Sequence, residues 1–114
     1  MPSRDWRLRI QDILDCIEKI SRYTEGMDFD NFSRDEKTVD AVVRNLEIIG
    51  EAACHVPEEL CERYSSLPWS KMRGMRNILA HDYTGVSLPI VWTTIKEDLP
   101  PLVSPLQGIL QSDT

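Results

Sequence analysis

One short stretch of the sequence gathers the side chains that could transfer protons or bind phosphate, Arg73-Gly-Met-Arg76-Asn77-Ile-Leu-Ala-His81-Asp-Tyr83. His81 is one of only two histidines, and an imidazole with an unperturbed pKa of about 6.5 is the usual acid or base near neutral pH. In an unbroken α-helix Arg73, Asn77 and His81 would share one face, because they are four residues apart. Arg76 would then lie about 140° round from His81. The two meet only if the helix frays, if the arginine reaches round, or if a second copy supplies one partner.

The elements that must position this stretch are indicated by periodic apolar residues. Spacings of three and four residues predict a first helix from about Ser3 to Thr24, ended by Gly26. Ser33 and Glu36 have the spacing of a capping box and predict the start of a second helix. Between the two helices we expect a short link, from which two aromatic rings pack onto the bundle, Phe29 and Phe32.

The second helix has three recognisable faces. Its core stripe comprises Val39, Val42, Leu46, Ile49 and Ala53. Its charged stripe comprises Asp40, Arg44, Glu47 and Glu51. Gly50 lies at the edge of the apolar face, where a missing side chain lets another helix approach closely. Ile48 and Ala52 point away from the core stripe, and we expect them to face another helix or a partner chain.

The remaining helices are shorter. Pro57-Glu58-Glu59 predicts the first turn of a third helix that ends near Tyr64. Trp69 opens a fourth helix with the core positions Met72, Met75 and Leu79. Ser87 starts a fifth helix with the apolar positions Leu88, Val91, Trp92 and Ile95, and Pro100-Pro101 interrupts it before a terminal helix with Leu102, Leu106 and Leu110. With no segment of β period, the pattern predicts an all-α, up-down bundle of four to six helices.

Length and composition indicate the number of domains, the cellular location and the state of the cysteines. We expect the 114 residues to form one domain, residues 1–114, with frayed ends. No apolar run is long enough for a membrane span and no secretory signal is visible, so we expect a cytoplasmic protein. The cysteines Cys16, Cys54 and Cys61 are odd in number and lack metal-ligand spacing, which favours free thiols.

Charge is distributed unevenly along the chain. The net charge of −6 argues against indiscriminate nucleic-acid binding. All nineteen acidic residues nevertheless lie outside the stretch from Arg63 to His81, which contains Arg63, Lys71, Arg73 and Arg76. Two interpretations stay open: a basic island that holds one anionic ligand, or cations that pair with the acidic helices.

The spacing from Arg76 through His81 to Tyr83 resembles the R-x4-H-x-Y motif of HEPN-domain proteins, in particular of the HepT-like toxin family. Arg44-Asn-Leu-Glu47-Ile-Ile-Gly50-Glu51-Ala-Ala is similar to a second recurrent stretch of that family. The resemblance extends from about Asp5 to Leu106 and includes Trp69, Met72, Val91-Trp92 and Asp98-Leu99-Pro100.

The resemblance implies a HEPN-like helical bundle that forms a homodimer, with two motifs in one cleft. Members of the family are metal-independent endoribonucleases without a cofactor, usually toxins of type II toxin–antitoxin pairs. An MNT-type nucleotidyltransferase antitoxin adenylylates the motif tyrosine. Matched onto this sequence, the resemblance implies that Arg76 and His81 are catalytic and that Tyr83 is modified by the partner. We expect Asn77 and Arg73 to support the catalytic pair. Tyr83 stands just before Gly85, where a helix would end.

The residue types suit this chemistry. Cleavage of RNA by its own 2′-hydroxyl requires a base, an acid and a cation that stabilises the developing phosphorane. Acid–base help is worth roughly 10²–10⁴-fold, and His81 suits it. A guanidinium binds phosphate oxygens in pairs, which suits Arg76. Asn77 could orient the imidazole or contact the phosphate.

Each residue also has an ordinary structural explanation. His81 could complement a helix C-terminus, Arg76 could pair with Glu47 or Glu51, and Tyr83 could be a half-buried aromatic. We expect His55 to be structural. A second class of function therefore stays open, a non-catalytic helical adaptor or nucleotide-binding subunit that holds a nucleotidyltransferase.

Overall fold

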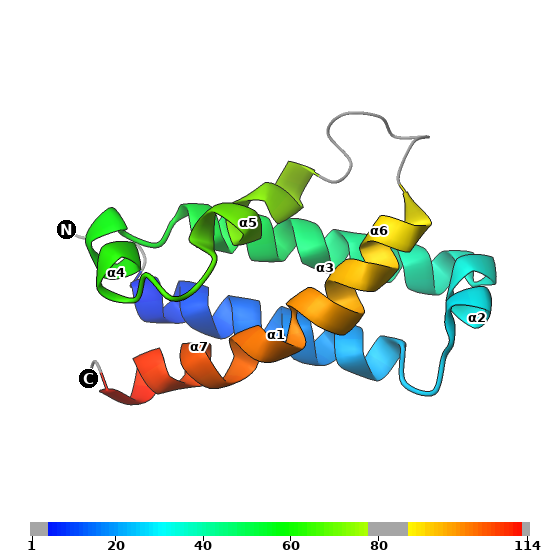
Figure 1. Ribbon diagram of the computed structural model, residues 1–114, viewed down its shortest axis with the longest axis horizontal. Helices are drawn as coiled ribbons and strands as arrows, with labels where there is room; N and C mark the ends of the chain where they lie inside the picture. Colours follow the sequence, from blue (N-terminus) through cyan, green and yellow to red (C-terminus); the bar gives the residue numbers. More distant parts are fainter. Residues whose placement is uncertain (1–4, 78–86, 113–114) are drawn as a thin grey trace.

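The chain folds into a bundle of helices (Figure 1). The computed structural model describes residues 5–77 and 87–112. Its elements are α1 (Trp6–Tyr23), α2 (Phe29–Arg34), α3 (Glu36–Cys54), α4 (Glu58–Arg63), α5 (Trp69–Gly74), the 3₁₀ turn η1 (Met75–Asn77), α6 (Leu88–Thr93), the π-helical turn η2 (Thr94–Asp98) and α7 (Pro100–Ser112). The described ranges contain no strand, which confirms the predicted all-α class. Within them no helix combines the length and the apolar character that a membrane span requires.

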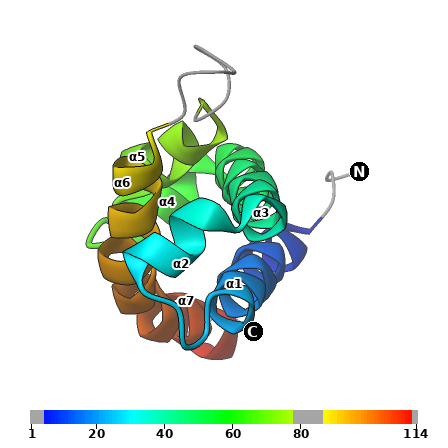
Figure 2. The same cartoon turned by 90° about the vertical axis from the view of Figure 1, so that its right-hand side faces the viewer.

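The two longest helices, α1 and α3, lie side by side and antiparallel along the bundle (Figure 1). α7 packs on α1, while α5 and η1 pack on α3. Seen from one end, the helices surround a common interior (Figure 2). The largest fully buried side chains come from most of the helices: Phe32, Ile10, Ile13, Ile20, Leu46, Ile49, Met72, Leu99, Leu106, Ile109, Val42 and Val91.

The N-terminus of α1 is determined by a capping side chain rather than by the apolar period. The helix begins at Trp6, later than the predicted Ser3, because the side chain of Asp5 accepts a hydrogen bond from the amide of Arg7. It ends at Tyr23, close to the predicted end. Gly26 follows in the turn with a φ of 78°, a conformation that glycine adopts without strain.

The predicted capping box at Ser33 and Glu36 is wrong. Residues 29–34 form the separate helix α2, capped reciprocally by Asp28 and Asn31. α3 begins at Glu36 with Asp35 as its N-cap, whose carboxylate accepts a hydrogen bond from the amide of Thr38 at 3.0 Å. That backbone hydrogen bond lowers the pKa of Asp35. Two aspartates therefore provide the caps, and Ser33 instead donates to the carbonyl oxygen of Asp30.

Two faces of α3 are covered, where the sequence indicated one. Val42, Leu46, Ile49 and Ala53 of the predicted core stripe are buried and Val39 is half-buried. Ala52 is only 2% exposed, so of the two neighbours expected for it, another helix and a partner chain, its own chain provides the cover. Ile48 is half-buried and packs against the core. The cause is tertiary, because α1 covers one side of α3 while α5 and η1 cover another.

The predicted fourth helix ends earlier than its pattern suggested. α5 stops at Gly74 and the chain tightens into the 3₁₀ turn η1, which has about three residues per turn. Met72 and Met75 are buried, as predicted. The common face expected for Arg73, Asn77 and His81 required an unbroken α-helix, and the described residues do not meet this condition, because the α-helix ends before Met75. Leu79 lies outside the described residues.

The last helices agree closely with their sequence signals. Ser87 caps α6, as predicted, and its side chain accepts a hydrogen bond from the amide of Ile90 at 3.4 Å. Trp92 packs its ring against Phe29 and Phe32, at centroid distances of 6.2 and 5.0 Å, so both rings reach the bundle as expected. The π-helical turn η2 precedes the prolines, and α7 begins at Pro100. In α7 the buried positions are Leu102, Leu106 and Ile109, while Leu110 is half-buried.

Candidate active site around Arg76

Arg76 lies on η1, the short turn that continues α5. Met72 and Met75 anchor this segment in the core, since both are buried. The next two residues, Arg76 and Asn77, are exposed. The side chain of Arg76 is 49% exposed. The turn therefore has a fixed inner side and presents a guanidinium and an amide at its outer side.

α3 approaches the backbone of this turn at Gly50. A Cβ atom added to Gly50 would lie 2.7 Å from the Cβ of Arg76 and 2.9 Å from its Cα, and closer still to its amide nitrogen. Non-bonded contacts under about 3 Å are essentially never found between a Cβ atom and another heavy atom. The predicted close approach at Gly50 is confirmed, and the approaching segment is the turn that contains Arg76.

The next residue of α3 contacts the guanidinium of Arg76. Nη1 of Arg76 donates to Oε1 of Glu51 at 3.4 Å. The other carboxylate oxygen of Glu51 lies 3.6 Å from Nδ1 of His55, which is also 2.9 Å from the Glu51 carbonyl oxygen. His55 is the C-cap residue of α3. Glu51 thus stands between a helix-end histidine and the candidate catalytic arginine.

The other cations near Arg76 pair with acidic residues of other elements. Nζ of Lys71 lies 3.2 Å from Oδ1 of Asp98 on η2. Nη2 of Arg73 lies 3.6 Å from Oε1 of Glu58 and donates to Sγ of Cys61 at 3.1 Å. The basic stretch of the sequence is therefore not a bare cationic patch, and the pairing interpretation describes these side chains.

Arg73 is directed to α4, because both of its partners, Glu58 and Cys61, lie there. Burial raises the pKa of the Cys61 thiol and outweighs the opposing effect of the Arg73 guanidinium. All three cysteines are unpaired, and two of them, Cys16 and Cys61, are buried. This confirms the expected free thiols. Arg73 contacts α4 while Arg76 contacts α3, so the structure does not bring the two guanidinium groups to one partner.

Only part of the predicted site falls within the described residues. His81 and Tyr83 lie outside them. Asn77 and Arg44 are exposed, and Glu47 is half-buried on α3. In residues 5–77 and 87–112 no group of three or more His, Cys, Asp or Glu side chains is placed to hold a metal ion. The sequence indicated a close approach at Gly50 and a possible ion pair at Glu51, but not that both residues contact Arg76.

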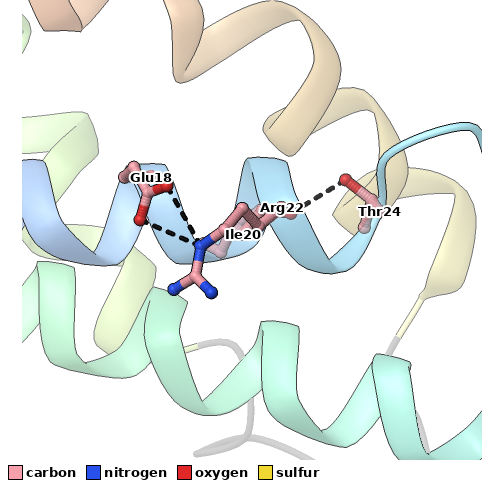
Figure 3. A network of polar contacts seen from close by, with 4 residues as sticks. All are labelled: Glu18, Ile20, Arg22 and Thr24. Carbon is pink, nitrogen blue, oxygen red and sulfur yellow. Dashed lines mark hydrogen bonds and ion pairs between the residues drawn. The ribbon is translucent and has the colours of Figure 1, made fainter.

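A surface groove of 1060 Å³ lies elsewhere, between α1 and the η2–α7 segment. Its wall on α1 includes Glu18, Arg22 and Thr24, shown in Figure 3. Nε of Arg22 donates to both carboxylate oxygens of Glu18 at 3.2 and 3.0 Å, and the Thr24 hydroxyl donates to the carbonyl oxygen of Ile20 at 2.8 Å. Glu18 and Arg22 thus pair with each other and Thr24 bonds the backbone of α1, and no residue of η1 lines the groove.

A comparison with protein families decides which family the sequence represents. A family model described as "Ribonuclease HepT-like" matches residues 13–109, a range from α1 to α7. The chain belongs to the HepT-like ribonuclease family. This confirms the resemblance inferred from the motifs around Arg76 and Gly50.

Individual relatives are similar to this chain over most of their length. A protein of Thermococcus cleftensis named "Probable ribonuclease HepT" is 42% identical over 82% of this chain and 84% of its own. A "Putative RNase" of Methanocaldococcus jannaschii is 36% identical over 97% of this chain and 92% of its own. Another of Caldanaerobacter subterraneus is 38% identical over 91% of this chain and 93% of its own. No solved structure gives a significant match.

Proposed function

We propose that this member of the HepT-like family is a metal-independent endoribonuclease in which Arg76 and His81 act on the scissile phosphate. The observation that supports it best is the placement of Arg76. Its backbone is packed on α3, while its guanidinium is half-exposed and able to meet an anion. Family membership supplies the substrate class, and the sequence places His81 five residues further along.

The proposed reaction is an internal transesterification. The 2′-oxygen forms a bond to phosphorus while the bond from phosphorus to the 5′-oxygen breaks. One proton leaves the 2′-hydroxyl and one reaches the 5′-oxygen. His81 performs one transfer, and water or the motif of a second copy performs the other. The guanidinium of Arg76 stabilises the charge that develops on the phosphorane oxygens.

The chemical ends of the products test this mechanism. Purified protein incubated with a defined RNA oligonucleotide should leave a 2′,3′-cyclic phosphate and a 5′-hydroxyl, which mass spectrometry distinguishes. The rate should be the same in excess EDTA, since arginine and histidine supply the charge and the proton transfers. The same oligonucleotide with a 2′-deoxy substitution at the cleavage site should resist. Products with 5′-phosphate ends, or inhibition by EDTA, would contradict the mechanism.

We further propose that the active form is a homodimer with both motifs in one cleft. Each chain has one motif, and the Ile90 side chain is 65% exposed on α6, the helix that follows the motif stretch. The sequence argument from Ala52 no longer applies, because Ala52 is buried within its own chain. Light scattering behind a sizing column should report twice the chain mass of 13.1 kDa. A monomer at micromolar concentration would exclude the shared cleft.

Regulation by a nucleotidyltransferase partner is the last part of the proposal. The chain would be the toxin of a type II pair, and an MNT-type antitoxin would attach AMP to Tyr83. The new phosphodiester and adenosine would stand seven residues from Arg76 in sequence and would compete with RNA for its guanidinium. Adenylylation should therefore abolish cleavage without unfolding the protein.

The adduct can be measured directly. The chain is co-expressed with a candidate nucleotidyltransferase, and the intact mass and the peptide masses are compared with those of the chain expressed alone. One adenylyl group on the peptide that contains Tyr83 is expected, and Tyr83→Phe should remove it. A neutralised complex with an unmodified tyrosine would mean that the partner acts by binding alone.

A further inference from the structure

Two consecutive residues of α3 contact Arg76 in different ways, one at its backbone and one at its guanidinium. We propose that Gly50 and Glu51 are positioning residues for Arg76: Gly50 places the turn and Glu51 aims the side chain. The inference rests on the proposed catalytic role of Arg76. Neither residue needs to touch RNA for this role.

The contact at Gly50 is with backbone, which cannot rotate away. A methyl group at this position would meet the amide nitrogen, Cα and Cβ of Arg76. Shortening the Arg76 side chain beyond Cβ would not relieve that overlap, so any side chain at position 50 must displace η1 itself. By contrast, a Cβ at Gly74 or Gly108 would meet nothing within 4 Å. The close approach is thus specific to the point where α3 passes the arginine.

The contact at Glu51 is of a different kind. Both side chains of the pair are about half-exposed, 49% for Arg76 and 55% for Glu51. Exposed ion pairs contribute little to the stability of a fold. A guanidinium has five N–H donors, and the recorded bond engages one nitrogen, Nη1. Glu51 can therefore restrict the direction of the group while donors stay available for a phosphate.

Together the two contacts restrain Arg76 at both ends of its side chain. Gly50 is buried at the contact with η1, and Glu51, the next residue round α3, is exposed at its edge. Misplacing a catalytic group by about 1 Å can cost on the order of 10²-fold in rate. Restraint by α3 matters here because η1 is only three residues long.

The backbone contact is tested by Gly50→Ala, with Gly108→Ala as the matched control in α7. Gly50→Ala should lower the rate of RNA cleavage by about 10²-fold, whereas Gly108→Ala should leave it unchanged. Side-chain ¹⁵N spectra of arginine, assigned with Arg76→Lys, should show the Arg76 signal shifted in Gly50→Ala and unshifted in Gly108→Ala. A folded Gly50→Ala protein with the wild-type rate and an unshifted Arg76 signal would overturn the proposal.

The ion pair is tested by Glu51→Gln, with Glu18→Gln as the control, because Glu18 forms an exposed pair with Arg22 within α1 (Figure 3). Glu51→Gln should lower the rate on the order of tenfold with an unchanged melting temperature. In an Arg76→Ala background, measured at high enzyme concentration, it should cost nothing further. An equal loss in both backgrounds would show that Glu51 does not act through Arg76.

The outcomes separate this inference from the function on which it rests. If wild-type protein leaves RNA intact, or Arg76→Ala cleaves normally, the proposed function fails, and the arginine spectra alone decide whether Gly50 and Glu51 hold Arg76. If Gly50→Ala does not fold, the test of the proposal is Glu51→Gln, because Glu51 is exposed. A Glu51→Gln protein with the wild-type rate and an unshifted Arg76 signal would then overturn the proposal.

Discussion

Replacement of His81 by alanine is expected to lower the rate of RNA cleavage by about 10²–10⁴-fold, the range that general acid–base catalysis supplies. The imidazole is the side chain of the motif whose unperturbed pKa, about 6.5, lies close to neutral pH. Wild-type cleavage should therefore have a limb in its pH–rate profile that depends on this imidazole. The residual activity of His81→Ala should lack this limb. Single-turnover cleavage of one RNA oligonucleotide across pH 5–9 measures both effects.

Loss of activity in His81→Ala must be separated from loss of folding. Circular dichroism and thermal unfolding should match those of wild type, because His81 follows a basic stretch of the sequence and is not part of an apolar stripe. In cells, expression of wild type alone should arrest growth and expression of His81→Ala should not. A His81→Ala protein that cleaves at the wild-type rate would exclude the proton-transfer role.

Removal of the Arg76 guanidinium is expected to have an effect of comparable size. Arg76→Ala should lose about 10²–10³-fold in the rate of cleavage, the cost of deleting one preorganised group that stabilises transition-state charge. Arg76→Lys should recover part of this loss, because lysine keeps the charge but not the paired donors. Rates measured at saturating RNA show whether the loss is in the chemical step.

Arg22→Ala is the matched control for Arg76→Ala. Arg22 also forms an ion pair with a glutamate, at 3.0 Å, but on α1 (Figure 3). Each variant breaks one exposed pair, so each should change the free energy of unfolding by no more than about 1 kcal/mol. Only Arg76→Ala should lose cleavage. Equal rates in the two variants would mean that Arg76 is one surface cation among others.

A large part of the fold follows from signals that are local in sequence. The apolar period alone identified α1 and the core stripe of α3, because an amphipathic helix must bury one face in any helical bundle. Capping and first-turn residues likewise predicted two helix starts. These are the N-cap Ser87 of α6 and the beginning of the helix Glu58–Arg63. The motif from Arg76 to Tyr83 and the stretch around Gly50 led to the correct family, since both are contiguous strings of residues.

Packing between distant segments decided the rest. α5 gives way to a 3₁₀ turn at Met75, and nothing in the local period predicts this. Ala52 is buried because other helices of the same chain cover more of α3 than its core stripe, and the helix by itself shows only one apolar stripe. The sequence alone left Arg76 free to pair with Glu47 or Glu51, and the tertiary structure selected Glu51. The physical reason is that an ion pair between residues 25 positions apart depends on how the two helices cross, which the backbone of Gly50 permits.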